Sequence, residues 1–213
     1  MKLLFFGDSI TDAGRERGKD GAPSSYGYGF VRAIAGKLLS SPRYTILNRG
    51  INGNKTVDLY ARVKADVWNE SPDVLTVLAG INDIAFDIKL NTGVEPARYK
   101  KVYRALLEET KERFPAMKII LMEPFMGRGA ETDGYYEAFC GVREYAAAVE
   151  QLAEEFALPF IPLQKDLDAL AQRLGAQAVL ADGVHPNIAG AELIAEKWLS
   201  AFRKLQGIND EDI

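Results

Sequence analysis

The sequence predicts a three-layer α/β/α sandwich built around a flavodoxin-like, five-stranded parallel sheet. Short apolar runs rich in β-branched and aromatic residues alternate with longer segments of helical period, which is typical of strands joined by crossover helices. Right-handed crossovers favour the strand order 2-1-3-4-5. Ligands of such sheets bind beyond the carboxyl ends of the strands, so the functional residues are expected there.

The expected strands cover residues 2–6, 44–47, 74–78, 118–122 and 159–162. Between them, apolar residues recur every three or four positions and indicate amphipathic helices. These stripes are Leu59, Val63 and Val67; Tyr99, Val102, Tyr103, Leu106 and Leu107; Val142, Tyr145, Ala146, Val149, Leu152 and Phe156; and Ile194, Trp198, Phe202 and Leu205. Core packing explains nearly all of them, but periodicity does not separate core from subunit interface, so a homo-oligomer stays open.

The length of 213 residues corresponds to one domain, expected over residues 1–206, with an acidic tail at 207–213. The 26 Lys and Arg residues are scattered and are outnumbered by 30 Asp and Glu, which argues against a nucleic-acid partner. No apolar run approaches the roughly 18 residues that span a bilayer, and the apolar start is too short for a secretory signal. We therefore expect no membrane partner and a cytoplasmic location.

The chain has one histidine, His185, and one cysteine, Cys140. Catalytic zinc sites usually draw on two or three His or Cys ligands, so no metal site is expected. A single cysteine forms no disulfide within the chain and fits a reducing compartment. Cys140 is expected to be an inert helix residue.

Polar residues and glycines gather in four segments at the expected ligand-binding edge. They are Gly7-Asp8-Ser9, the run from Asn48 to Asn54, Gly80-Ile81-Asn82-Asp83, and the run from Asp182 to Asn187. Each has a structural explanation when taken alone: a helix cap by Asp8 or Ser9, a plain loop before a helix capped by Thr56, or a turn.

The segment before the last helix has the most specific local pattern. Pro186 holds His185 away from helical geometry, and Asn187 is a natural N-cap. Residues three apart in a turn approach to roughly 5–6 Å, so the Asp182 carboxylate can bond to His185 Nδ1. With a serine, a glycine loop and an asparagine at the other strand ends, the four segments make a complete inventory for acyl transfer.

The four segments together resemble the conserved blocks of the SGNH (GDSL-type) hydrolase family, in order and over almost the whole chain. The resemblance implies that Ser9 is the nucleophile, His185 the general base and acid, and Asp182 its orienting carboxylate. It also implies an oxyanion hole formed by Ser9, Gly53 and Asn82, and a reaction that needs no metal or organic cofactor.

Within this family the chain looks most like bacterial carbohydrate acetylesterases of the acetylxylan esterase type, through residues 7–15, 48–54 and 80–83. The expected function is therefore a serine esterase acting on small acyl esters, with an acetylated oligosaccharide as one candidate substrate. A lysophospholipase or thioesterase acting on longer chains is the alternative within the family. Outside it, a non-catalytic flavodoxin-like binding module with Asp8 and Asp12 at a strand end stays open.

Two irregular stretches, residues 14–29 and 124–136, are expected to rim the site. The residues that they supply are Arg15, Arg17, Tyr26, Tyr28, Phe125, Met126 and Arg128. Trp68 and Trp198 lie in helical stripes and are expected in the core or at a subunit contact.

Overall fold

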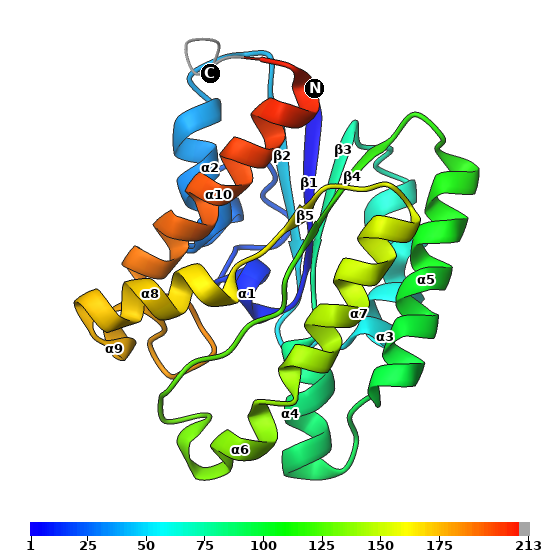
Figure 1. The fold of residues 1–213 in the computed structure, drawn as a ribbon. Helices are drawn as coiled ribbons and strands as arrows, with labels where there is room; N and C mark the ends of the chain where they lie inside the picture. The colour runs from blue at the N-terminus through cyan, green and yellow to red at the C-terminus, as the bar shows by residue number, and fades with distance from the viewer. Residues whose placement is uncertain (209–213) are drawn as a thin grey trace.

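The computed structural model describes residues 1–208 and shows five parallel strands in the order β2-β1-β3-β4-β5, with helices on both faces (Figure 1). This confirms the predicted sandwich and strand order. The strands are β1 Lys2–Gly7, β2 Thr45–Gly50, β3 Val74–Leu78, β4 Lys118–Met122 and β5 Phe160–Ile161. Of the acidic tail expected at 207–213, residues 209–213 lie outside the described residues.

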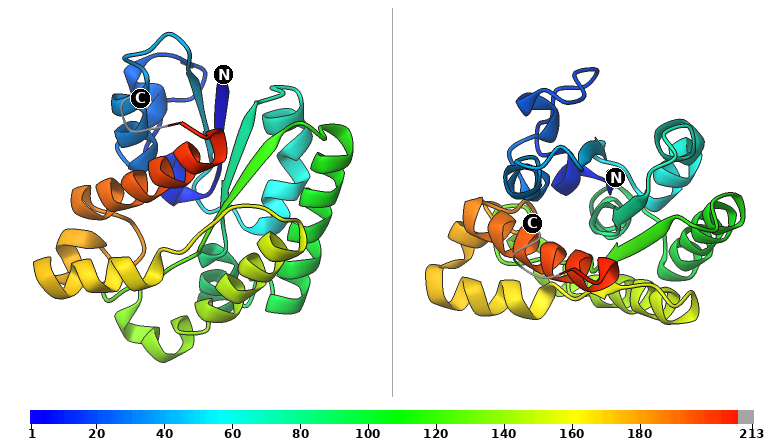
Figure 2. Two further views of the ribbon diagram at one scale, coloured as in Figure 1. Left: turned by 45° about the horizontal axis from the view of Figure 1, so that its top comes forward. Right: turned by 90° about the horizontal axis from the view of Figure 1, so that it is seen from above.

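Two groups of helices enclose the sheet. Helices α2 and α10 contact each other over one face, while α3, α5 and α7 form a row over the other (Figure 2). The helices are α1 Ser9–Asp12, α2 Phe30–Leu38, α3 Thr56–Val63, α4 Ile81–Leu90, α5 Pro96–Arg113, α6 Tyr136–Phe139, α7 Val142–Glu155, α8 Gln164–Leu174, α9 Ala176–Val179 and α10 Ile188–Gln206. The remaining helical turns are Pro23–Tyr26, Lys64–Trp68 and Asp133–Tyr135. Because both faces are covered, β1, β3 and β4 are buried along almost their whole length.

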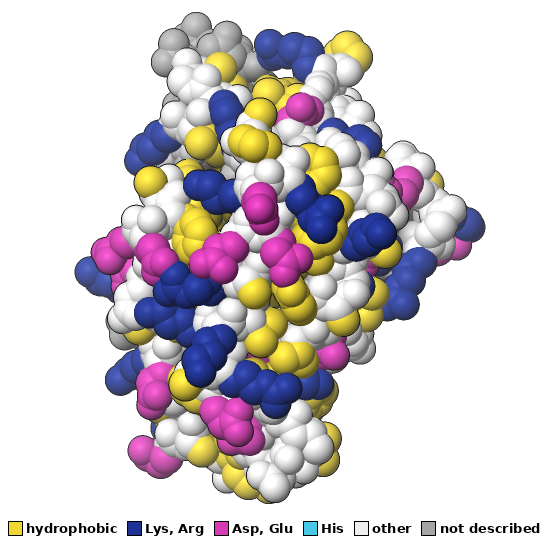
Figure 3. Space-filling view, turned by 90° about the vertical axis from the view of Figure 1, so that its right-hand side faces the viewer, with side chains coloured by type: hydrophobic (Ala, Val, Ile, Leu, Met, Phe, Trp, Pro, Cys, Tyr) yellow, Lys and Arg dark blue, Asp and Glu magenta, His cyan; other side chains and the backbone are white. Residues whose placement is uncertain are grey.

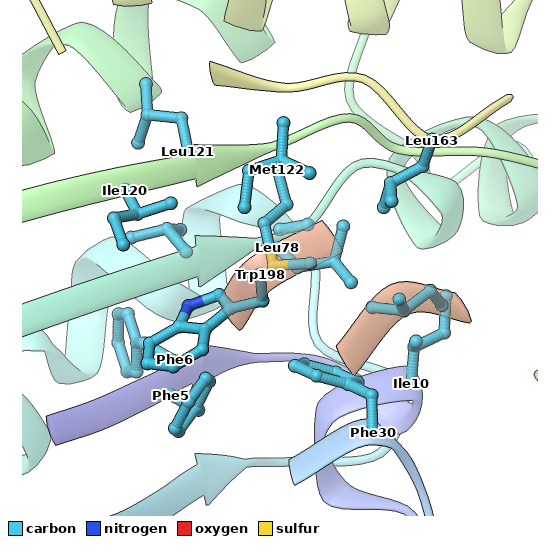
Figure 4. Packing of buried hydrophobic residues seen from close by; sticks show 14 of the residues in the cluster. Phe5, Phe6, Ile10, Phe30, Leu78, Ile120, Leu121, Met122, Leu163 and Trp198 are labelled. Carbon is cyan, nitrogen blue, oxygen red and sulfur yellow. The ribbon is translucent and has the colours of Figure 1, made fainter. Parts of the chain in front are cut away.

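Trp198 of α10 anchors the core on the α2 side of the sheet. Its ring stacks on Phe202 at 4.8 Å. The same ring lies 5.0 Å from that of Phe5 on β1 (Figure 4). Its buried indole N–H donates to Thr76 Oγ1 at 2.8 Å, which satisfies the one polar group of the ring. Trp198 is therefore a core residue, whereas Trp68 is partly buried and donates to Thr110 on α5.

Strand β2 extends three residues beyond the expected end at residue 47, so three of the seven residues of the expected glycine and asparagine loop belong to the sheet. Residues 48–50 pair in register with Phe5, Phe6 and Gly7 of β1. Asn48 is tolerated there because its buried amide donates to the Thr11 and Tyr26 carbonyls and its oxygen accepts the Gly50 N–H.

Strand β5 is shorter than expected, because only residues 160 and 161 pair with β4. Pro159 and Pro162 flank it, and proline offers no N–H to a sheet ladder. Cys140 also differs from the expectation: it is a half-buried free thiol at the C-cap of α6 rather than inside a helix.

The side of the molecule that carries α5 has basic and acidic side chains intermixed over its surface (Figure 3). On this side Arg104 of α5 pairs with Glu155 of α7, and Lys100 bonds to Gln151 one turn away. Among residues 1–208, no helix has both the length and the apolar character that crossing a bilayer would require.

The end of β2 packs closely on α1, so one methyl group added at this point should destabilise the fold. A Cβ added at Gly50 would lie 2.1 Å from the Asp12 backbone nitrogen. We expect Gly50→Ala to destabilise the fold by at least about 1–3 kcal/mol, because backbone rather than a flexible side chain must move. Thermal unfolding followed by circular dichroism measures the change.

The matched control is Gly36→Ala on the exposed side of α2, where an added Cβ meets no atom within 4 Å. This variant should instead gain about 0.5–1 kcal/mol from helix propensity. Equal melting temperatures for the two variants would show that the end of β2 can accommodate a Cβ at position 50.

Candidate active site

The turn after β1 presents Ser9 at the lower edge of the sheet in Figure 1, where α1 begins. Gly7 is required there because an added Cβ would lie 2.4 Å from the Leu78 carbonyl oxygen. Asp8 is the N-cap, and its Oδ1 accepts the Ile10 N–H at 2.9 Å. Because Asp8 takes the capping role, the Ser9 hydroxyl is left to face its neighbours across the edge.

The loop before α10 brings His185 to that hydroxyl. His185 Nε2 lies 2.9 Å from Ser9 Oγ, and Nδ1 lies 2.7 Å from Asp182 Oδ2. The other carboxylate oxygen, Oδ1, accepts the backbone N–H groups of Val184 and His185 at 2.9 and 2.8 Å. Burial raises the pKa of Asp182, but these bonds to His185 and Val184 outweigh burial and hold it below its usual value.

Residues 124–136 support the Asp182 loop instead of rimming the site. Gly127 N–H donates to the Gly183 carbonyl at 2.8 Å, and Glu131 N–H donates to the Asp182 carbonyl at 2.9 Å. Gly183 has φ +95, and an added Cβ would lie 2.3 Å from Thr132 Oγ1. The expected rim is therefore wrong for Phe125 and Met126, which are buried, and Arg128 lies over the Tyr136 ring.

A second turn, from Ile51 to Asn54, follows β2. The Asn54 N–H donates to the Ile51 carbonyl at 3.2 Å, and Gly53 has φ +78 at the third position, as in a type II turn. The turn is joined to the first one, since the Ile51 N–H donates to the Gly7 carbonyl at 3.1 Å. Asn82, on the first turn of α4, donates from Nδ2 to the Asn54 carbonyl at 3.1 Å.

Asp83 holds α3 and α4 together beneath this edge. Its buried carboxylate accepts the Thr56 backbone N–H at 3.1 Å and the Thr56 hydroxyl at 3.2 Å. Thr56 is the first residue of α3, with Lys55 at the cap, so the expected cap lies one residue earlier. Burial raises the pKa of Asp83 to about 7, and burial likewise raises that of Asp8 to about 7.

A cavity of about 590 Å³ opens in front of Ser9, Asp182 and His185. Its outer wall includes Tyr28 and Ile188, each 78% exposed. Tyr28 is the residue of the expected 14–29 rim that lines this cavity together with Gly14. Three other side chains of that stretch point elsewhere: Tyr26 is buried, Arg15 Nε donates to the Gly50 carbonyl, and Arg17 faces Asp12.

Sequence reasoning missed Ile188 and Arg62, and it assigned no role to Asn52 beyond its place in the run from Asn48 to Asn54. Ile188 and Asn52 line the cavity, but a single apolar or polar residue beside a loop carries no signal of its own. Arg62 bonds to both turns of the site. Its one sequence signal is the spacing to Asp66, which is that of an ordinary surface ion pair on a helix.

This arrangement is the one found in serine hydrolases: a serine contacts a histidine, and the histidine contacts an aspartate. Here it lies at the carboxyl ends of the strands of an α/β sheet. The model of the GDSL-like Lipase/Acylhydrolase family matches residues 5–193, and the chain belongs to this family. The protein is a carboxylic ester hydrolase.

Comparisons with similar proteins support this assignment. An acetylxylan esterase from Geobacillus stearothermophilus is 35% identical over 207 residues, which cover 93% of this chain and 92% of that enzyme. The crystal structure of an acetylxylan esterase from the same organism has a TM-score of 0.83 at 34% identity, covering 94% of this chain and 93% of that one. A protein from Parabacteroides merdae ATCC 43184, assigned as a GDSL-like lipase, has a TM-score of 0.86 at 36% identity and covers 94% of both chains.

The buried Asp8 carboxyl predicts a defined pH dependence of stability. Its folded-state pKa of about 7 lies above the ordinary value of 3.8, so between these values the folded chain keeps a proton that the unfolded chain has released. The stability that this group contributes is full below about pH 4 and is lost as the pH rises through about 7. Asp8→Asn mimics the protonated carboxyl and keeps the oxygen that accepts the Ile10 N–H.

We therefore expect the melting temperature of Asp8→Asn minus that of the wild type to increase between pH 4.5 and pH 8. Asp133→Asn, which changes an exposed side chain, is the control for removal of a carboxylate. A difference that is constant or falls over this range would show that Asp8 is ionised in the folded protein.

Proposed function

We propose that the protein removes acetyl groups from short carbohydrate chains, with Ser9 as nucleophile, His185 as general base and acid, and Asp182 as the residue that orients the histidine. The observation that carries the proposal is the unbroken row of contacts from Ser9 Oγ through both ring nitrogens of His185 to Asp182 Oδ2. Catalytic mutants of the Geobacillus acetylxylan esterase replace one serine, one aspartate and one histidine, and its aspartate and histidine are also three residues apart.

In the first half of the reaction, His185 Nε2 takes the Ser9 proton as Oγ bonds to the ester carbonyl carbon. Asp182 accepts the Nδ1–H and stabilises the imidazolium that forms. Its lowered pKa keeps the carboxylate ionised for this task. The tetrahedral intermediate then breaks its bond to the alcohol oxygen, which receives the proton from His185, and the acetyl group stays on Ser9.

The negative charge on the carbonyl oxygen would be met by the backbone N–H groups of Ser9 and Gly53 and by the Asn82 carboxamide. One N–H of that carboxamide is used by the Asn54 carbonyl, which fixes the amide and leaves its second N–H for the substrate. Each such donor is worth roughly 2.7–4 kcal/mol in other oxyanion holes. In the second half, His185 takes a proton from the water that attacks the acyl carbon, and it returns this proton to Ser9 Oγ as the bond between Oγ and the acyl carbon breaks and the acetyl group leaves as acetate.

The surroundings of the cavity favour a sugar as the alcohol part of the ester. Tyr28 lies against Gly14, where an added Cβ would be 2.6 Å from the ring, and its other side is exposed at the cavity. Beyond Tyr28 and Ile188 lies a second hollow of about 370 Å³, which shares both residues with the first. Arg32, Lys37 and Glu192 line this second hollow and offer polar partners suited to hydroxyl groups rather than to a long acyl chain.

The similar enzyme from Geobacillus stearothermophilus points the same way, since it is described both as an acetylxylan esterase and as an acetyl-xylooligosaccharide esterase. The cavity at Ser9 is lined in large part by polar side chains, among them those of Asp12, Asn52 and Asn187, which suits a sugar better than the long acyl chain of a lysophospholipase or thioesterase substrate. A non-catalytic binding module would leave the Ser9, His185 and Asp182 contacts without a role. That the protein forms a homo-oligomer remains a prediction.

Ser9→Ala and His185→Ala should each abolish most of the esterase activity. The double variant should lose little more than either single variant, because both residues act in the same step. Hydrolysis of p-nitrophenyl acetate, with folding checked by circular dichroism, measures the effect. Normal turnover by either single variant would refute the proposed mechanism.

Tyr28→Ala should raise KM for acetylated xylo-oligosaccharides about five- to tenfold, which is about 1–1.4 kcal/mol of lost ring contact. Hydrolysis of ethyl acetate should change much less, because the alcohol part of that substrate has no sugar ring to pack on Tyr28. Tyr135→Ala removes a tyrosine that is also exposed but does not line either hollow, and it serves as the matched control. An equal loss on both substrates would remove Tyr28 from sugar binding.

A further inference from the structure

Arg62 of α3 is more enclosed than a surface arginine needs to be. Its side chain is 15% exposed, and the guanidinium carbon lies 4.3 Å from the centre of the Phe6 ring. It pairs with Asp66 one turn further along the helix at 2.5 Å. That pair uses one donor of a group that has five, so it does not explain where the rest of the guanidinium points.

The other bonds of Arg62 reach three segments outside its own helix. Nη2 donates to the Gly7 carbonyl at 2.9 Å, Nη1 to the Arg49 carbonyl at 2.9 Å, and Nε to Asn54 Oδ1 at 2.6 Å. These acceptors lie at the end of β1, at the end of β2 and in the turn that follows β2. A planar fork of donors can hold such divergent acceptors at once, whereas a lysine ammonium on a flexible stem cannot hold them in one plane.

Each proposed oxyanion donor is tied to one of these contacts. Gly7 lies two residues before Ser9, and its carbonyl also accepts the Ile51 N–H of the second turn. Asn54 follows Gly53, and its carbonyl accepts the Asn82 amide. The guanidinium therefore fixes the turn that carries Ser9 relative to the turn that carries Gly53, and it reaches Asn82 through Asn54.

We propose that Arg62 is a positioning residue for the oxyanion hole: it sets the separation between the Ser9 turn and the Gly53 turn. This inference rests on the proposed esterase function. Oxyanion donors act only when they lie about 2.7–3.1 Å from the developing charge, and a shift of about 1 Å in such a site can cost about 100-fold in rate. The hydrogen bonds of Arg62 go to Asp66 and to the two turns rather than to Ser9 Oγ or His185, so Arg62 acts on the reaction through the positions of these turns.

The test compares Arg62→Ala, Arg62→Lys and Asp66→Asn on p-nitrophenyl acetate. We expect Arg62→Ala to lower kcat about 10- to 100-fold with KM within about twofold, and Arg62→Lys to fall between it and the wild type. Asp66→Asn keeps the other three bonds of Arg62 and should lose less than about threefold.

A second comparison separates positioning from a general loss of stability. If Arg62 acts through the hole, Arg62→Ala should reduce kcat by a smaller factor in an Asn82→Ala background than in the wild type. An equal factor in both backgrounds, an Asp66→Asn loss as large as that of Arg62→Ala, or a wild-type kcat in Arg62→Ala would overturn the inference. If Arg62→Ala does not fold, Arg62→Lys and its combination with Asn82→Ala decide by the same criteria.

Hydrogen–deuterium exchange supplies a readout that does not depend on turnover. Exchange over residues 51–54 should increase in Arg62→Lys while residues 182–185 stay as in the wild type. Unchanged exchange over 51–54 would contradict the positioning role. Esterase activity that survives in the Ser9→Ala variant would instead refute the proposed function. The exchange result would still decide whether Arg62 holds the turn.

Discussion

The candidate site depends on the position of β1 between β2 and β3. In the parallel register Gly7 lies opposite Gly50 on one side and opposite Leu78 on the other, so three strands end at the same level. The segments that follow them therefore start side by side, and they carry Ser9, Gly53 and Asn82. Glycine at positions 7 and 50 lets the strand ends and α1 approach more closely than any Cβ would permit.

His185 reaches this edge by another route, because no strand leads directly to it. It lies 176 positions from Ser9, and its loop is supported by the antiparallel bridge between Leu180 and Pro186 and by residues 127–132. Packing of α10 on α2 sets the direction in which the loop enters. The strand ends thus fix three proposed groups directly, while the position of the histidine depends on loop packing that tolerates little change at Gly183.

Much of this arrangement could be predicted from the sequence, because it follows from local patterns. The alternation of strands and helices, with right-handed crossovers, predicted the sheet order, and the run from Asp182 to Pro186 indicated the carboxylate–histidine contact. The features that could not be predicted depend on tertiary contacts. The extension of β2 through Asn48 depends on acceptors supplied by Thr11 and Tyr26, and the burial of Phe125 and Met126 depends on where the 124–136 stretch packs. Neither Asp83 nor Arg62 differs in sequence from an ordinary helix residue, so their bonds to Thr56 and to the two turns appear only in the fold.

The most direct measurement is the intact mass of the protein quenched during turnover of p-nitrophenyl acetate, followed by peptide mapping. The proposed mechanism predicts a mass increase equal to one acetyl group, located on Ser9 and absent from Ser9→Ala. Full turnover with no acetyl group on Ser9 at any quench time, or an acetyl group carried by another residue, would contradict it.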